Sequence, residues 1–192
     1  TAPNAAFIND PAGVSDKRLD SPSLAIASTF AQLTFRNNYV LESSGGSFFD
    51  GGVVEISING GAFTDVITAG GSFVTGGYTG TISAASSAIN GRQAWTNTSG
   101  GYIDTVANLG PNVVGQTIKL RFRMASDSSV GAAGWRIDTL KVLTAFSCCG
   151  VSGTPVIAAD GNATVTAENF TPPNNTPDPG ETVTATFPLK NT

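Results

Sequence analysis

Hydrophobic and polar residues alternate with a period of two along several stretches of this chain. In residues 117–124 single basic residues separate apolar ones, in the order Ile118, Lys119, Leu120, Arg121, Phe122, Arg123 and Met124. Such alternation turns one face of a β-strand toward a core and the other toward solvent. The stretch is predicted to be a half-buried strand whose cations lie opposite acids such as Glu55 on neighbouring strands.

A second alternating run ends in a tight turn. Val54, Ile56 and Ile58 are separated by single polar residues, and the run stops at Gly60-Gly61. Glycine readily adopts the positive φ that a two-residue hairpin turn requires. Residues 63–67 are therefore predicted to be the return strand of a hairpin.

Three further segments have strand-like composition, namely residues 23–28, 33–39 and 135–143. Since no amphipathic helix of ten or more residues separates the strands, the pattern favours an all-β antiparallel sandwich over alternating βαβ units. Residues 69–101 are rich in glycine and too long for a hairpin turn. We expect them to form a loop excursion that carries a binding surface.

The composition changes after Phe146, which indicates a domain boundary. The predicted organisation is a β-sandwich over residues 1–147, a linker over 148–155 and a separate tail over 156–192. The tail contains two or three short strands around turn-rich residues, and about forty residues in so few strands cannot close a sandwich core. We therefore expect it to be the incomplete first strands of an Ig-like domain.

Composition narrows the class of protein and of partner. The 192 residues include 23 glycines and only 12% charged residues, with a formal net charge of -4, a mixture too apolar for a disordered chain. The ten Lys and Arg residues are spread along the chain, which argues against a nucleic-acid partner. No apolar run approaches the roughly 20 residues needed to span a bilayer. We expect a soluble, processed part of a longer protein.

The sequence contains no histidine. This excludes a Ser-His-Asp triad, a Cys-His dyad and an H-E-x-x-H zinc motif. Catalysis would have to rest on carboxylates, as in glycoside hydrolysis. Nothing in the sequence pairs any of its 14 acids across a cleft, so the chain is predicted not to be an enzyme.

Two cysteines, Cys148 and Cys149, are adjacent in the sequence. Adjacent cysteines cannot staple distant segments of one chain, and the C-x-x-C spacing of redox motifs is missing. A vicinal disulfide, two free thiols and bonds to another part of a longer protein all stay open.

Several acidic residues occupy predicted loops and offer oxygen ligands to a hard cation. These residues are Asp10, Asp16, Asp20, Glu42, Asp50 and Asp138. Ca²⁺ takes six to eight oxygen ligands and needs neither nitrogen nor sulfur. The alternative is that these acids cap turns through Asx hydrogen bonds, which is common in loops rich in glycine and proline. Glu42 and Asp50 bracket one Ser/Gly-rich loop between two predicted strands.

The aromatic residue Trp95 lies in a polar loop three positions after Arg92. An indole ring among glycines and hydroxyls can stack on a sugar ring while Arg92 binds the sugar hydroxyls. Alternatively, the ring folds back and closes one end of the sandwich. Trp135 is the first residue of the strand predicted at 135–143 and is expected in the core.

An ordered series of motifs resembles a known family. The series runs Leu33-Thr-Phe-Arg with Tyr39 and Glu42, Asp50-Gly-Gly-Val-Val-Glu-Ile-Ser with Asn59-Gly-Gly, Gly91-Arg-Gln-Ala-Trp95, Gly115-Gln with Leu120-Arg-Phe-Arg and Asp127, and Gly134-Trp-Arg-Ile-Asp138. In this order it resembles the MAM-like jelly roll of secreted bacterial proteins, a module that accompanies metallopeptidases of the immune inhibitor A type. The run that starts at Asn174 is similar to the first strands of Ig-like repeats in bacterial surface proteins.

The resemblance implies an extracellular or cell-surface accessory domain of two packed antiparallel sheets, galactose-binding-like or MAM-like in type. It also implies a structural Ca²⁺ near the first loop and the last strand. Carried over to this chain, the calcium ligands would be Asp16, Glu42, Asp50 and Asp138.

The function expected from this resemblance is a non-catalytic binding or accessory module. Its partners would be neighbouring domains of the parent protein, among them a peptidase, together with a glycan or protein ligand. One alternative is a carbohydrate-binding module that uses Trp95 and Arg92. The other is a fragment of a carboxylate-based hydrolase.

Overall fold

The computed structural model describes residues 5–144, 157–169 and 172–191. The chain divides into two compact units, Thr1–Phe146 and Ser147–Thr192, which are described separately. The linker predicted at 148–155 lies outside the described residues. Across the described ranges the structure is all-β apart from one 3-10 turn, η1 (Pro111–Val113). In these ranges no helix has the length and apolar character needed to cross a membrane.

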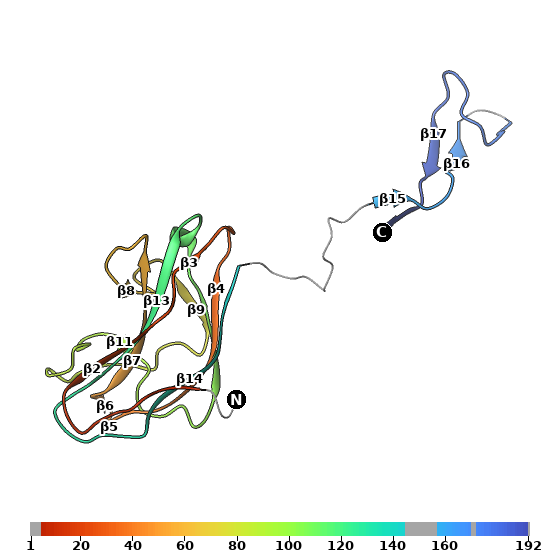
Figure 1. Cartoon of the computed structure of the whole chain (residues 1–192). Helices are drawn as coiled ribbons and strands as arrows, with labels where there is room; N and C mark the ends of the chain where they lie inside the picture. The colour runs from red at the N-terminus through yellow and green to blue at the C-terminus, as the bar shows by residue number, and fades with distance from the viewer. Residues whose placement is uncertain (1–4, 145–156, 170–171, 192) are drawn as a thin grey trace. The chain divides into compact units, whose positions relative to one another are not determined.

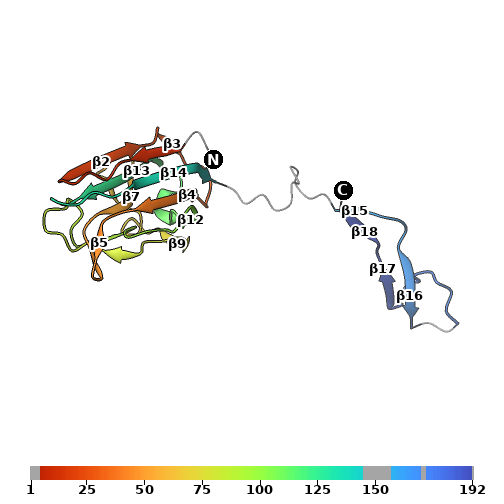
Figure 2. The same cartoon turned by 90° about the horizontal axis from the view of Figure 1, so that it is seen from below.

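The first unit is a sandwich of two antiparallel sheets, as the alternation predicts (Figures 1 and 2). The first sheet has the strand order β1 (Ala6–Ile8), β14 (Gly134–Leu143), β4 (Gln32–Val40), β12 (Ile103–Asn108) and β9 (Ser72–Thr75). The second has the order β2 (Ser15–Asp20), β13 (Thr117–Ser126), β7 (Gly51–Ile58) and β8 (Thr64–Asp65), and β3 (Leu24–Ala25) also pairs with β13. Two short hairpins complete the unit, β5 (Ser43–Ser44) with β6 (Ser47–Phe48) and β10 (Gly80–Thr81) with β11 (Gln93–Ala94).

Successive long strands alternate between the two sheets. The chain passes from β1 to β2 in the opposite sheet, returns to the first sheet with β4 and crosses again to β7. The strands β12, β13 and β14 alternate in the same way, so that β1 pairs with β14 and β2 pairs with β13. This connectivity is that of a jelly roll, which confirms the fold class expected from the sequence.

The main core lies between the two sheets. Strand β13 contributes the side chains that alternation predicts, namely Ile118, Leu120, Phe122 and Met124. Strand β4 faces them with Leu33, Phe35 and Tyr39. Trp135 of β14 is fully buried there, as expected, and its indole Nε1 donates a hydrogen bond to Oδ1 of the buried Asn37 (2.5 Å).

Strand β7 is buried on both faces, although its alternation predicts one solvent face. Val53, Glu55 and Ser57 point away from the main core, yet each is at most 4% exposed. The cover comes from the part of residues 69–101 around β10 and β11, which packs on the outer face of the second sheet, whereas β9 extends the first sheet beside β12. This segment is therefore not the loop excursion that was expected. The resulting second apolar cluster consists of Val53, Ile82, Ala84, Ile89, Ala94 and Ala125.

Two glycines at the start of β7 allow this packing on both faces. A Cβ on Gly51 would lie 2.7 Å from the side chain of Ile82, and one on Gly52 would lie 2.8 Å from the ring of Trp135. Real Cβ atoms do not approach other atoms this closely, so any larger residue would displace the neighbouring side chain. The Gly-Gly pair therefore fixes how near the covering segment and the tryptophan come to β7.

Other predicted elements are shorter than expected, and some strands were not predicted. The strand expected at 23–28 consists only of β3, and the return strand at 63–67 consists only of β8. Strand β2 was missed because its sequence, Ser-Asp-Lys-Arg-Leu-Asp, has a single hydrophobic residue. Its place at the sheet edge depends on backbone pairing and on ion pairs with β13.

The second unit consists of two separate antiparallel ladders. One pairs β15 (Ile157–Ala159) with β18 (Leu189–Asn191), and the other pairs β16 (Thr164–Glu168) with β17 (Val183–Thr186). Strands β15, β16 and β17 overlap the segments 156–159, 164–167 and 182–187, where the sequence predicts short strands, whereas β18 was not predicted. Among the side chains described in this unit, those of residues 159–169 and 172–190, none is buried. The described part of the tail therefore has no core of its own, as its size predicts.

Candidate cation site

Four acidic residues from separate segments meet at the end of the sandwich that carries the β5–β6 hairpin (Figure 1). Asp10 follows β1, Glu42 follows β4, Asp50 directly precedes β7 and Asp127 follows β13. Strand pairing brings them together, because Gly51 at the start of β7 lies opposite Ala125 near the end of β13. We refer to these four residues as the acidic cluster.

The carboxylates of the acidic cluster lie close together and are deeply placed. Ligand oxygens of Glu42, Asp50 and Asp127 all lie within 4.8 Å of one another. Asp50 is fully buried, and its Oδ1 accepts a hydrogen bond from the backbone N–H of Asp127 (2.7 Å). Within the described residues, Oδ2 of Asp50 and Oε2 of Glu42 are buried without a hydrogen-bond partner. Such oxygens destabilise the fold unless a proton or a cation neutralises them.

Burial and mutual repulsion favour the neutral form of these carboxyls. Burial, and then the neighbouring Asp10, raise the pKa of Asp50 to about 8. Burial also raises the pKa of Asp10, against the opposing effects of Asp50 and of backbone N–H groups. The pKa of Glu42 is raised by burial first and then by the charges of Asp127 and Asp10. All three shifts have the sign expected where negative charge is concentrated without a counterion.

A short hairpin sets the positions of Glu42 and Asp50. Strands β5 and β6 are joined by Gly45 and Gly46, which have φ of 58° and 85°. Two consecutive residues with positive φ form the tight turn that matches the twist of a hairpin. The backbone carbonyl of Glu42 accepts hydrogen bonds from the N–H groups of Phe49 (3.3 Å) and Asp50 (3.5 Å), which closes the base of the hairpin. The local sequence thus brings the two acids side by side.

The acidic cluster fits a calcium ion. Its carboxylates offer only oxygen ligands, which is the type that Ca²⁺ takes, whereas Zn²⁺ prefers nitrogen and sulfur. Lys17 acts on Asp10 at longer range, but its Nζ is hydrogen-bonded to the backbone oxygen and Oδ1 of Asn9 (both 2.8 Å). A bound divalent cation would supply the counterion that the buried carboxylates need.

The structure brings together two of the four calcium ligands expected from the sequence, Glu42 and Asp50. Asp16 lies elsewhere, on β2, where Arg123 holds both of its carboxylate oxygens at 2.7 and 3.0 Å and keeps its pKa below the ordinary value. Asp138 lies within β14, where its Oδ1 accepts a hydrogen bond from the N–H of Thr139 at a bulge. Neither is among the carboxylates that converge at the hairpin.

The other two members of the acidic cluster come from Asp10 and Asp127. Asp10 was one of several acidic loop residues noted in the sequence, but it was not among the four predicted calcium ligands. Asp127 belongs to the motif series that carries the resemblance, but it was not assigned as a ligand. Its contact with Asp50 spans 77 positions and depends on the pairing of β7 with β13, a register that a single sequence does not reveal.

The alternative role for Trp95 as a sugar-stacking platform is wrong. The side chain is 0% exposed, and its Nε1 donates a hydrogen bond to the backbone oxygen of Gly76 (2.9 Å). Phe35, Phe73 and Tyr78 surround the ring with centroids 4.8–5.6 Å away, mostly edge to face. The ring folds back into the core, as the other interpretation expected, and no face is left for a ligand.

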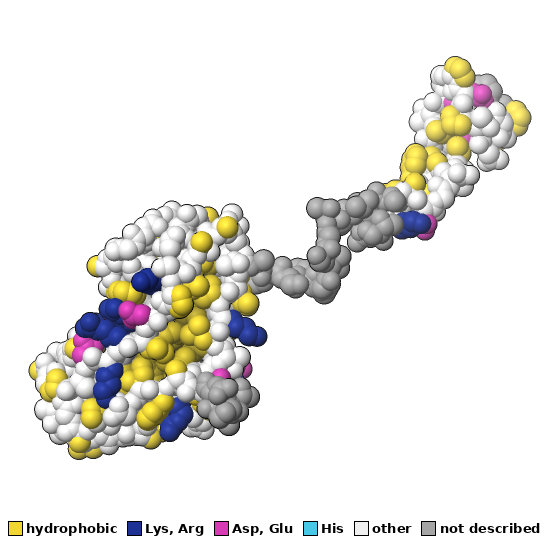
Figure 3. Space-filling view, viewed as in Figure 1, with side chains coloured by type: hydrophobic (Ala, Val, Ile, Leu, Met, Phe, Trp, Pro, Cys, Tyr) yellow, Lys and Arg dark blue, Asp and Glu magenta, His cyan; other side chains and the backbone are white. Residues whose placement is uncertain are grey.

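Arg92 belongs to a charge ladder across the outer face of the second sheet, formed by Asp16, Arg123, Glu55, Arg92 and Asp65. Arg92 donates to Glu55 (2.5 Å) and Asp65 (2.9 Å), and Arg123 donates to Asp16 and to the same Glu55 oxygen (3.2 Å). Figure 3 shows basic and acidic side chains next to one another over this part of the sandwich. Arg121 and Arg123 of β13 are thus paired with acids of neighbouring strands, as predicted.

No protein-family model matches the chain, and a comparison with curated proteins finds no significant match. Because one fold hosts many functions, the jelly roll by itself does not identify an activity. Function is therefore inferred from the acidic cluster, from the remaining surface and from the resemblance noted in the sequence.

Proposed function

We propose that the jelly-roll unit is a non-catalytic extracellular accessory module whose fold a bound Ca²⁺ stabilises. The observation that carries this proposal is the convergence of four carboxylates at one end of the sandwich, with Asp50 fully buried among them. Calcium sites of extracellular modules need only moderate affinity, with dissociation constants on the order of 10⁻⁴ to 10⁻³ M. The resemblance to MAM-like modules supports the accessory role, with neighbouring domains of an exported parent protein as partners.

The placement of the acidic cluster favours cation binding over hydrolysis. A glycoside hydrolase needs two carboxyls on either side of the scissile bond, about 5 to 10 Å apart and open to the substrate. Here the oxygens of three carboxylates lie within 4.8 Å of one another, and Asp50 is 0% exposed. A substrate bond cannot enter between them, whereas a single ion can.

Thermal unfolding with and without calcium tests the proposal. The chain is stripped with a chelator, dialysed and heated without metal, with Ca²⁺ or with Mg²⁺, and unfolding is followed by the fluorescence of Trp95 and Trp135. A cation at about 100 times its Kd stabilises the folded state by about 2.7 kcal/mol, which raises the Tm of a unit of this size by about 5–10 °C. Mg²⁺ demands a smaller octahedral site and should give a smaller rise.

Elemental analysis of the stripped protein completes the test. If the protein contains no metal after stripping and calcium leaves its Tm unchanged, the proposal is wrong. Both tryptophans lie in the sandwich, so the fluorescence signal reports this unit and not the second one.

A further inference from the structure

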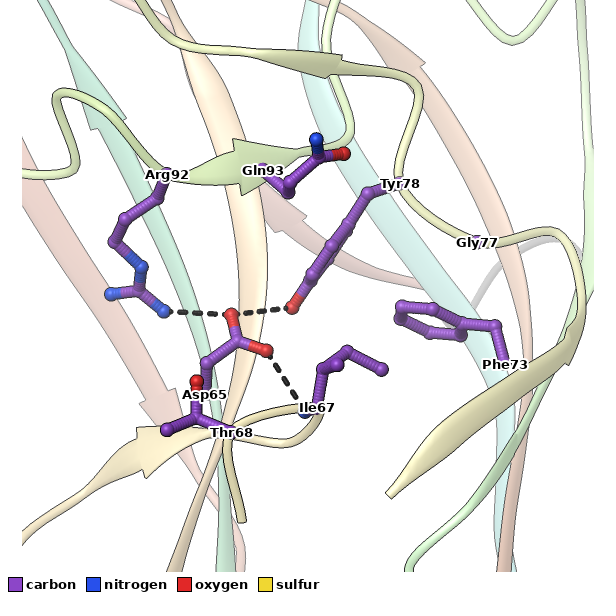
Figure 4. A pocket seen from close by; sticks show the side chains of 8 residues that line it. All are labelled: Asp65, Ile67, Thr68, Phe73, Gly77, Tyr78, Arg92 and Gln93. Atoms are coloured by element: carbon purple, nitrogen blue, oxygen red, sulfur yellow. Dashed lines mark hydrogen bonds and ion pairs between the residues drawn. The ribbon is translucent and has the colours of Figure 1, made fainter. Parts of the chain in front are cut away.

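A pocket lies on the outer side of the second sheet, between β8 and the segment that covers β7 (Figure 4). Its volume is about 580 Å³, which is within the range of small-molecule sites. The lining residues are Asp65, Ile67, Thr68, Phe73, Gly77, Tyr78, Arg92 and Gln93. None of them belongs to the acidic cluster.

One wall of the pocket is aromatic and fixed in position. The rings of Phe73 and Tyr78 meet edge to face, with centroids 4.8 Å apart, and the buried Trp95 packs behind both. Gly77 lies beside them, and a Cβ there would come within 2.9 Å of the Phe73 ring. The absence of that side chain leaves room next to the ring, so the wall offers an apolar surface already held in place.

The opposite wall is polar and held by hydrogen bonds. Asp65 accepts hydrogen bonds from Arg92 (2.9 Å), from the hydroxyl of Tyr78 (3.0 Å) and from the N–H of Ile67 (3.0 Å), as Figure 4 shows. Arg92 uses one N–H for Asp65 and one for Glu55, out of the five that a guanidinium carries. The amide of Gln93 adds a donor and an acceptor on an exposed strand.

The electrostatics of this wall disfavour a charged ligand. Arg92 is balanced by Glu55 and Asp65, so it presents hydrogen-bond donors without a net positive charge. A carboxylate or phosphate would gain little attraction and would meet two acids close by. A ligand with neutral hydroxyls can instead accept from Arg92 and donate to Asp65, since hydroxyls do both.

We propose that this pocket binds a neutral sugar ring, with an apolar face of the ring against Phe73 and Tyr78 and its hydroxyls on Arg92, Asp65 and Gln93. This goes beyond the proposed function, because it names a ligand class for the module. It uses different residues from the acidic cluster and does not require the cation. The buried Trp95 supports the aromatic wall and does not touch the sugar.

Titration of the ¹⁵N-labelled chain with neutral mono- and oligosaccharides tests the proposal. Two-dimensional ¹H–¹⁵N spectra are recorded up to about 20 mM sugar, which detects binding with a Kd in the millimolar range. We expect shifts of the backbone signals of Thr68, Gly77 and Gln93 with a saturable dependence on concentration. Shifts at other sites only, or none with any neutral sugar, would overturn the proposal. Binding of acidic sugars or apolar aromatic probes alone, without any neutral sugar, would also overturn the proposal.

Matched variants locate the site. Phe73→Leu keeps an apolar side chain but removes the ring, and it should weaken binding about three- to tenfold. The control Phe63→Leu removes a ring that lies under the guanidinium of Arg121, outside the pocket, and should leave the Kd unchanged. Gln93→Ala, at an exposed position, provides a second test if Phe73→Leu does not fold. Pocket variants with the parent's Kd would overturn the assignment.

Measuring sugar binding in stripped and calcium-loaded protein separates the two proposals. Sugar binding without any calcium effect on Tm would refute only the cation proposal. A calcium effect without sugar binding would refute only this one.

Discussion

Replacing Asp50 by Asn isolates the effect of one buried charge. The carboxyl of Asp50 accepts a hydrogen bond from the N–H of Asp127 and lies beside Asp10. An asparagine at this position can still accept from Asp127, while its NH₂ group can donate to Asp10. Asp50→Asn therefore resembles the protonated carboxyl in shape and hydrogen bonding, and it cannot ionise.

The size of the effect follows from the pKa of Asp50, which is about 8 in the folded state against an ordinary value of 3.8. Because the folded value is the higher one, the folded state holds the proton more tightly. Ionisation therefore opposes folding, and the free energy of unfolding falls as the pH rises from about 4 to about 8. At pH 7 without calcium this loss amounts to about 4 kcal/mol, which Asp50→Asn avoids.

Calcium should narrow the difference in stability between the two proteins. The parent gains about 2.7 kcal/mol at a calcium concentration 100 times its Kd. The variant lacks one charged ligand and should gain much less. The assay is urea unfolding followed by tryptophan fluorescence at about pH 5 and pH 8, with and without calcium. We expect the stripped parent to lose about 3–4 kcal/mol between these pH values, and the variant to lose much less.

Two controls neutralise an aspartate away from the acidic cluster. Asp104→Asn changes a side chain that is 82% exposed and 3.9 Å from Arg36, and it should behave like the parent in every condition. Asp16→Asn removes an ion pair with Arg123 but should keep the full calcium response. The reasoning is refuted if Asp50→Asn is no more stable than the parent without calcium and responds to calcium equally well.

Two further substitutions test the packing and the ion pairs of β7. Gly52→Ala should lower the free energy of unfolding by about 1–3 kcal/mol, because its Cβ would lie 2.8 Å from the ring of Trp135. Gly13→Ala, with no atom within 4 Å of the new Cβ, is the control, and equal losses in urea unfolding would contradict this account. Arg92→Met should cost about 3 kcal/mol, since it removes a partner of Glu55, which is 3% exposed. A loss below about 1 kcal/mol, typical of an exposed pair, would show that the contact contributes little.

The sequence predicted the fold correctly for strands that have one buried face and one face exposed to solvent. This condition holds for β4 and β13, whose alternation matched their burial. It fails for β7, which is covered on both sides by segments distant in sequence. The consecutive apolar pair Val53-Val54 was a signal of two-sided burial, because strands buried on both faces read as continuous apolar runs. Strand β2 gave no signal, since its charged side chains pair across the sheet surface.

Only the part of the acidic cluster that lies within one short segment of the chain could be predicted. Glu42 and Asp50 are joined by a nine-residue hairpin segment whose glycines are visible in the sequence. Their contacts with Asp10 and Asp127 arise from strand register and from the jelly-roll connectivity. Neither is encoded in a local pattern, because register depends on which strands become neighbours.

The connectivity of the jelly roll also constrains the order in which the unit can fold. Among the described strands β1 pairs only with β14, and Ile8 lies opposite Trp135. During synthesis β1 and β2 therefore wait for partner strands that lie more than a hundred residues later in the chain. Closing such long loops is slow, because chain entropy is lost before the contacts form. Since the acidic cluster joins Asp10 to Asp127, a cation at this place would bind only after this closure. It would stabilise the finished sandwich and would not start its assembly.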